Sequence, residues 1–346
     1  MRRFRNRIAE IVEESGIKLN SICKTSGVSH TYLTKVIRGQ INCPGKDKIA
    51  SILLAMNYTI SQINEVLAGY DYQPLNKHDI PEIKKNNRKR KIEGTTMPLF
   101  DHIYVELLLV SLEQMGGTKL LIKNRPSSIY MPEDLYLWGE FPFETQEEAR
   151  DFRIEFTLAL FKERRELFLK NCAAGHRVEN YICKHCLEEF IANKIPHAGQ
   201  NLSTKESRKQ EMFLQYFANA MGAILRNPDQ FKTHIVKRCA YFECQIQDAE
   251  GKSPKVSFPG KKLHDYETNR LDHISLEGFT SDAPATIKLF LNEIKLCRRT
   301  VEDDIAQNYP HSYLNYVLDL FDKIGLKPAL QSYIEESISK PEYSFL

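Results

Sequence analysis

Apolar residues recur at helical spacing through the first 68 residues of the chain. The first such face predicts a helix over residues 3–15 that ends at Gly16, and it consists of Phe4, Ile8, Ile11 and Val12. Similar faces predict four more helices, over residues 19–26, 30–38, 49–56 and 59–67. The N-terminal part is therefore predicted to be all-α, with five short helices.

Local signals mark where these helices meet. Gly27 lies between the second and third helices, where a glycine tolerates the positive φ of a steep turn. Ser29 is a good N-cap for the third helix, and Gly39 ends it. Thr59 and Gln62 have the spacing of a capping box at the start of the fifth helix. Five short helices with a glycine turn between the second and third form a specific pattern.

The segment from Ile22 to Gly39, with Pro44 and the helix 49–56 after it, resembles the phage Cro/repressor-type (Xre) helix-turn-helix family. The resemblance covers about a fifth of the chain and depends on the Gly-Val-Ser turn and the apolar spacing that follows it. Leu19 stands where members often carry a Gln that supports a phosphate contact. The resemblance implies a five-helix, lambda-repressor-like DNA-binding domain over residues 1–72.

The family places its third helix in the major groove. By position, the resemblance implies that His30, Thr31 and Lys35 contact base edges. Their chemistry suits this role, because Lys can donate to guanine and the Thr methyl can contact thymine. Phosphate contacts are expected from Ser29, Thr34, Arg38, Gln40 and Asn42. Tyr32 is expected either to contact the DNA backbone or to pack half-buried. The alternative is an exposed helix face that contacts no DNA.

The charge distribution agrees with a DNA-binding head. The net charge of +3 divides into +8 over residues 1–94, with 17 Lys and Arg against 9 Asp and Glu, and −5 over the remainder, with 31 against 36. Within residues 73–98 the run from Lys84 to Lys91 is strongly basic, and prolines flank it at Pro74, Pro81 and Pro98. We expect this segment to be an extended, self-repelling linker, with a phosphate clamp as the alternative.

Residues 99–346 show a mixed pattern that predicts an α+β domain, mostly helical with short strands. Helices are expected over residues 100–114, 145–170 and 203–225, and again in the tail from 284 to 337. Strands are expected over residues 118–122, 128–131 and 234–247, with a hairpin from 248–251 to 256–258. We expect this domain to regulate or oligomerise the protein, and to respond to a small-molecule or protein effector.

Four metal-ligating residues cluster within the larger domain. Cys172, His176, Cys183 and Cys186 include a Cys-x2-Cys pair, and such N and S donors suit a structural Zn²⁺ site within residues 172–186. His185 or His197 could replace one ligand. A redox-sensing Cys183–Cys186 pair is the alternative. Two other residues, Cys239 and Cys244, are expected to be core cysteines.

The sequence lacks the motifs that mark several other classes of protein. The chain has no P-loop, dinucleotide glycine fingerprint, His-Glu-x-x-His or Gly-x-Ser-x-Gly motif, and no apolar run of membrane-spanning length. We therefore expect a cytoplasmic, nucleoid-associated regulator that binds double-stranded DNA as a homodimer, most simply as a repressor. The alternatives are an enzyme or defence effector with an autoregulatory DNA-binding head, and an antitoxin-like repressor whose large domain binds a protein partner.

Overall fold

The structure is a computed structural model, and it describes residues 7–56, 58–89, 95–97, 102–137, 147–199, 201–240, 243–258 and 278–339. The chain divides into two compact units. The first comprises residues 1–114, 139–164 and 259–280, and the second comprises residues 115–138, 165–258 and 281–346. Each unit is described by itself below.

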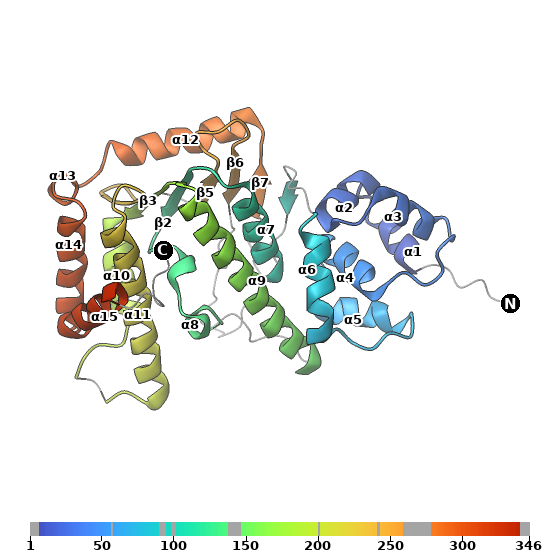
Figure 1. Ribbon diagram of the computed structural model, residues 1–346, viewed down its shortest axis with the longest axis horizontal. Helices are drawn as coiled ribbons and strands as arrows, with labels where there is room; N and C mark the ends of the chain where they lie inside the picture. Colours follow the sequence, from blue (N-terminus) through green and yellow to red (C-terminus); the bar gives the residue numbers. More distant parts are fainter. Residues whose placement is uncertain are drawn as a thin grey trace. The chain divides into compact units, whose positions relative to one another are not determined.

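The first unit begins with a helical region. Its α-helices, labelled in Figure 1, are α1 (Arg7–Glu14), α2 (Leu19–Ser26), α3 (His30–Ile37), α4 (Lys46–Ala55), α5 (Ile60–Ala68) and α6 (Ile80–Asn87). A 3₁₀ helix, η1 (Lys77–Asp79), precedes α6. Most of the described apolar positions that predict the helices form its core, including the fully buried Ile8, Leu33, Ile49, Ile52, Leu53, Ile60 and Ile63, whereas Phe4 lies outside the described residues. Burial of each such side chain contributes about 1.5–3 kcal/mol, which offsets the poor stability of isolated helices this short.

The predicted caps are present in this region. Gly27 follows α2 with a φ of 69°, in the left-handed region. Ser29 caps α3 by accepting a hydrogen bond from the backbone N–H of Tyr32. Thr59 and Gln62 form the expected capping box at the start of α5. These signals act within one turn of chain, so the sequence alone is enough to place them.

The segment after α5 corrects the expectation of an extended linker over residues 73–98. Instead, Ile80–Asn87 forms α6, which contacts α2 and α4. Ile80 and Ile83 are buried on one face, and Pro81 occupies the first turn, where a proline is tolerated. The first cations of the basic run, Lys84 and Lys85, therefore belong to an amphipathic helix with a docked face. Arg88 and Lys89 follow its end, and residues 90 and 91 lie outside the described residues.

Polar contacts hold α6 on α4. The side chain of Asn86 is 1% exposed, and its amide donates to Asp47 Oδ2 at 2.9 Å and to Ser51 Oγ at 3.1 Å. Lys48 donates to the Asn86 side-chain oxygen. Because Asp47, Lys48 and Ser51 all belong to α4, this one amide satisfies its hydrogen bonds only when α6 is docked.

The remainder of the first unit contains the short strands β1 (Thr95–Met97) and β7 (Gly278–Ser281), which pair antiparallel, and most of α7 (His102–Met115). It also contains residues 147–164 of α9 (Glu147–Ala173). A buried ion pair joins these two helices, with Arg164 Nη1 2.8 Å from Glu106 Oε1. From α6, Lys84 and Arg88 both pair with Glu163 of α9.

A mixed sheet forms the centre of the second unit. Its strands are β2 (Lys119–Lys123), β3 (Val178–Cys183), β4 (Phe231–Val236), β5 (Cys244–Gln247) and β6 (Lys255–Phe258), and their order is β6-β5-β2-β3-β4. β2, β3 and β4 are parallel, which requires crossover connections through helices. β5 and β6 form the predicted antiparallel hairpin. Burial of almost every residue of β2 and β3 shows that both faces are covered.

Helices cover this sheet on two sides. α12 (Pro284–Arg298) contacts β3 to β6, and Figure 1 shows it on the opposite side of the strands from α10 (Lys184–Lys194) and α11 (Thr204–Arg226). α11 begins with the expected Ser203–Glu206 capping box. The remaining elements are η2 (Ser128–Tyr130), α8 (Glu133–Leu137), α13 (Asp303–Ala306), α14 (His311–Asp322) and α15 (Lys327–Ser339).

The prediction of an N-terminal helical region followed by a mostly helical α+β region is confirmed. Two strand expectations need correction. Residues 128–130 form η2, a 3₁₀ helix that Ser127 caps, and the strand expected over residues 234–247 is divided between β4, which ends at Val236, and β5, which begins at Cys244. Among the described helices, none combines the length and the apolar character that a membrane span requires.

Candidate functional site

The first candidate site is the outer face of α3. Leu33 and Val36 anchor the helix because both are fully buried. The opposite face is exposed and polar, and the exposed residues on it and just beyond it are Ser29, His30, Thr31, Lys35, Arg38, Gln40 and Asn42. Tyr32 and Thr34 are half-buried. α3 is therefore held by one face and presents donors, acceptors and cations on the other.

Local hydrogen bonds distinguish the roles of these residues. The Tyr32 hydroxyl accepts a hydrogen bond from the Gly45 backbone N–H at 3.0 Å, so this side chain ties α3 to the start of α4. His30 Nδ1 and Thr34 Oγ1 lie 3.3 Å apart, one turn from each other on the helix. Tyr32 is half-buried, while its expected alternative, a contact with the DNA backbone, stays a prediction.

The turn between α2 and α3 sets the angle at which α3 projects. The Gly27 backbone N–H donates to Cys23 O at 3.0 Å, which ends α2 in a left-handed cap. Val28, next in the turn, is 3% exposed and anchors the turn to the core. The direction of α3 therefore depends on a backbone conformation that glycine adopts without strain.

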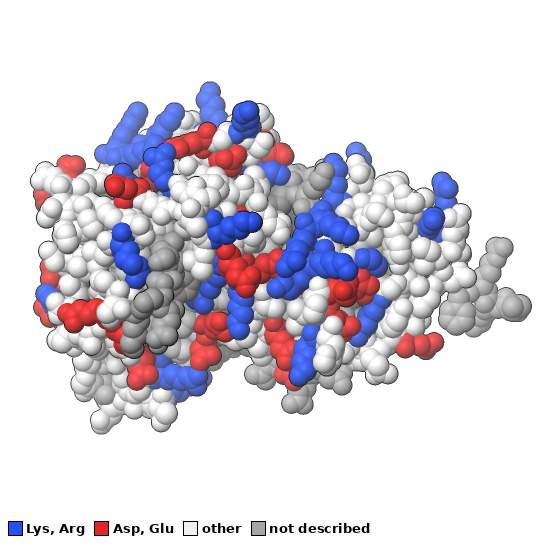
Figure 2. All heavy atoms as spheres, in the orientation of Figure 1, with Lys and Arg blue, Asp and Glu red and all other residues white. Residues whose placement is uncertain are grey.

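A second basic surface lies on and next to α6, and its cations form ion pairs with acidic side chains. Figure 2 shows Lys and Arg side chains gathered over α6, with Asp and Glu side chains beside them. Lys84 and Arg88 both pair with Glu163, and Lys85 pairs with Glu82. Because these cations already have carboxylate partners, we regard α3 as the stronger candidate for phosphate contact.

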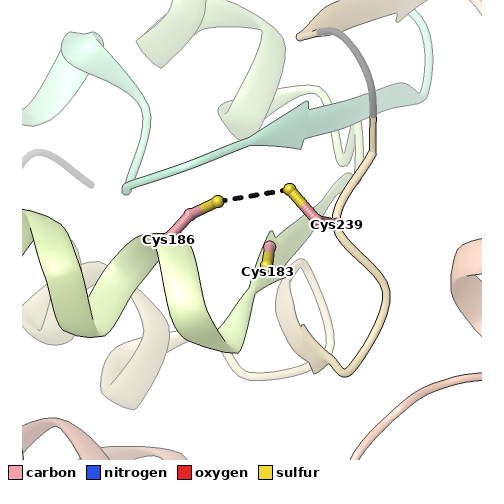
Figure 3. Close-up of side chains that lie close together, drawn as sticks. All are labelled: Cys183, Cys186 and Cys239. Carbon is pink, nitrogen blue, oxygen red and sulfur yellow. Dashed lines mark hydrogen bonds between the residues drawn. The ribbon is translucent and has the colours of Figure 1, made fainter.

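The second candidate site is a cluster of three cysteines in the second unit. Cys183 ends β3, Cys186 lies in the first turn of α10, and Cys239 follows β4, as Figure 3 shows. Their sulfur atoms all lie within 4.8 Å of one another, close enough to hold a metal ion such as zinc. Cys186 Sγ and Cys239 Sγ are 3.5 Å apart, and all three residues are free thiols.

The surroundings of Cys186 favour the protonated form of this one thiol. Burial raises the pKa of Cys186 to about 12, and contacts with Cys239 and Cys183 act in the same direction. Three thiolates this close would repel one another without a cation between them.

The ligand set predicted from the sequence needs correction. Cys172 lies near the end of α9, and His176 accepts a hydrogen bond from the Gly117 backbone N–H through Nδ1. Both precede β3, whereas Cys183 and Cys186 lie at its far end. The six residues Val178–Cys183 form a strand about 20 Å long, which separates the two pairs. β3 therefore fills most of the interval between His176 and Cys183.

The two histidines that could replace a ligand have other partners. His185 is exposed and pairs with Glu189 on α10, and His197 Nε2 lies 2.9 Å from Ala192 O. Neither joins the three sulfur atoms. Cys239, expected to be a core cysteine, is exposed, whereas Cys244 is buried as predicted.

Strand pairing explains how Cys239 reaches the cluster. β3 and β4 run parallel with Cys183 opposite Val236, so the chain leaving β4 passes beside the first turn of α10. Cys239 is only three residues beyond Val236. Recognising it from sequence requires knowledge that these two strands are adjacent, parallel and in this register.

A cluster of polar side chains lies between α12 and β3, on the same face of β3 as Cys183. Arg298 Nε donates to Tyr181 OH at 2.6 Å, and Arg298 Nη2 donates to Glu179 Oε2 at 2.9 Å. The Tyr181 ring stacks on His234 with centroids 4.9 Å apart. Burial lowers the pKa of His234, nearby Arg298 and Lys232 lower it further, and Glu179 opposes them.

We expect the free energy of unfolding to fall as the pH drops below about 6.5. The folded protein disfavours protonated His234, so the unfolded chain binds more protons below the ordinary histidine pKa. Because only one group is involved, the loss cannot exceed about 1.4 kcal/mol per pH unit, and chemical denaturation at several pH values measures it. His234→Gln should flatten this dependence, whereas His197→Gln, a half-buried histidine outside this cluster, should change it less. Equal slopes in all three proteins would contradict the assignment.

Comparisons of this chain with family models, with curated proteins and with solved structures find no match.

Proposed function

We propose that this protein is a sequence-specific, DNA-binding transcriptional regulator in which α3 reads the major groove. The single observation that carries the proposal is the exposed polar face of α3, which an apolar inner face and a left-handed glycine turn hold in place. The five helices α1 to α5 support a lambda-repressor-like arrangement, and the net charge of +8 over residues 1–94 supports a polyanionic ligand.

Within this proposal the exposed residues have distinct roles. His30, Thr31 and Lys35 contact base edges, because they lie on the first turns and the outer face of α3. Ser29, Arg38, Gln40 and Asn42 flank that face and contact phosphates. Thr34 is half-buried beside His30 and orients its ring. We further propose that a homodimer binds two half-sites, about one helical turn of DNA apart.

The test begins with selection of bound sequences by the full-length protein from random duplex DNA. We expect a two-fold symmetric site to be enriched, with affinity that falls steeply as salt rises. Lys35→Ala should weaken binding to this site by roughly 10- to 100-fold and relax specificity at one base pair. Failure of the full-length protein to bind any duplex at low salt would overturn the proposal.

Lys77→Ala is the matched control for charge. Lys77 is also exposed, but it lies on η1, outside α2 and α3, so its loss removes one positive charge without altering the proposed reading face. We expect less than a few-fold change in affinity and no change in base preference. If Lys77→Ala and Lys35→Ala weaken binding equally for every sequence, α3 does not read bases.

A further inference from the structure

We infer that Cys183, Cys186 and Cys239 form a site for one thiophilic metal ion of the Zn²⁺ class, with a coordination position left open to an external ligand. This inference does not depend on the proposed DNA-binding function, because it concerns the second unit alone.

The geometry of the three sulfur atoms suits such an ion. In a tetrahedral zinc site with Zn–S bonds of about 2.3 Å, neighbouring sulfur atoms are about 3.8 Å apart. Here all three lie within 4.8 Å of one another, and Cys186 Sγ is 3.5 Å from Cys239 Sγ. Side-chain movements of about 1 Å would therefore complete the three bonds. A disulfide would need an S–S distance of about 2.05 Å, much shorter than the one observed.

The chain holds the three ligands from both sides, so the site is largely preformed. Next to Cys239, Arg238 makes a bidentate ion pair with Glu293 of α12. Next to Cys183, Lys184 forms an ion pair with Glu302, which also pairs with Lys237. These contacts fix the chain after β4 against the start of α10, and less ordering is needed when an ion binds.

The chemistry of the donors selects the class of ion. Three thiolates favour zinc and other soft cations over Mg²⁺ or Ca²⁺, which prefer oxygen ligands. Among the described residues, no His, Asp or Glu joins the three sulfur atoms as a fourth ligand. Cys183 is buried, Cys186 is half-buried and Cys239 is exposed, so the cluster opens towards solvent on the Cys239 side. Zinc sites with three protein ligands keep a fourth position for water or another ligand.

The experiment uses the full-length protein, reduced and freed of metal. Co²⁺ serves as the spectroscopic probe, and Zn²⁺ affinity is measured by competition with a chelating dye. We expect one equivalent of either metal to bind and Co²⁺ to show thiolate charge-transfer absorption. Cys239→Ser should lower Zn²⁺ affinity on the order of 100-fold or more, because one of three ligands is removed. Cys239 is exposed, so this substitution should leave the fold intact, which circular dichroism checks.

Two further variants make the assignment specific. Cys43→Ser removes another exposed cysteine, in the first unit, and should leave affinity unchanged. His176→Gln tests the earlier candidate ligand and should also leave affinity unchanged. The inference is overturned if Cys239→Ser binds Zn²⁺ as tightly as the unmodified protein, or if His176→Gln weakens binding as much as Cys239→Ser does.

The open coordination position has its own readout. Imidazole added to the Co²⁺-loaded protein should shift the visible absorption of the cobalt while one equivalent of metal stays bound. A spectrum that imidazole does not change would show a closed coordination shell, and would contradict the open position.

Discussion

Gly27→Ala is expected to lower the free energy of unfolding of the α1–α6 region by more than about 3 kcal/mol. A Cβ at this position would lie 1.9 Å from the backbone oxygen of Asn86 and 2.8 Å from its carbonyl carbon. Because both atoms belong to the backbone of α6, they cannot rotate away. The helix would have to move off α2 and α4, breaking the buried hydrogen bonds of Asn86 to α4. Chemical denaturation followed by far-UV circular dichroism measures the loss.

Gly39→Ala is the matched control for backbone strain. Its φ of 68° is almost the same as the 69° of Gly27, but among the described residues, its two chain neighbours aside, no atom lies within 4 Å of the added Cβ. Gly39→Ala should therefore cost only about 1 kcal/mol, the cost of a left-handed conformation. The difference between the two losses of unfolding free energy measures the cost of the steric clash with α6. Equal losses would show that α6 does not pack against the turn.

Arg164→Met is expected to destabilise the first unit by about 3–5 kcal/mol. The Arg164 and Glu106 side chains are 4% and 1% exposed, so the substitution leaves a buried carboxylate without its counter-charge. Arg164 also lies over the Phe161 ring, and methionine preserves much of that apolar contact. The free energy of unfolding, measured in urea at neutral pH, reports the effect.

Two comparisons identify the cause of this loss. In the double variant Glu106→Leu and Arg164→Met, neither charge of this buried pair remains, and most of the stability should return. Arg177→Met breaks an ion pair of similar length, 2.7 Å, whose side chains are 54% and 58% exposed, and it should cost less than about 1 kcal/mol. If the double variant is less stable than Arg164→Met alone, the loss comes from packing and not from an unpaired charge.

The candidate sites differ in how far the sequence could predict them. The exposed face of α3 could be anticipated because helix periodicity and the Ser29 cap are signals within one or two turns of chain. The metal ligands could be anticipated only in part. The Cys183–Cys186 pair is local, but Cys239 is 53 residues from Cys186 and joins it through strand pairing. The Cys172–His176 pair had suitable spacing, but an intervening strand carries it away.

The sequence by itself determined the α1–α5 helices, their glycine turn, the capping boxes at Thr59 and Ser203, and the β5–β6 hairpin. Each of these depends on hydrogen bonds or apolar faces between residues close in the chain. Tertiary structure alone decided that the basic segment around Lys84 docks as α6, and that Cys239 completes the sulfur cluster. The high charge density of this segment favours an extended chain. Packing against α4 and α9 opposes it, because burial of Ile83 and Asn86 stabilises the helix, and this packing is visible only in the tertiary structure. Strand order and register likewise depend on the whole second unit, and short-range patterns do not encode them.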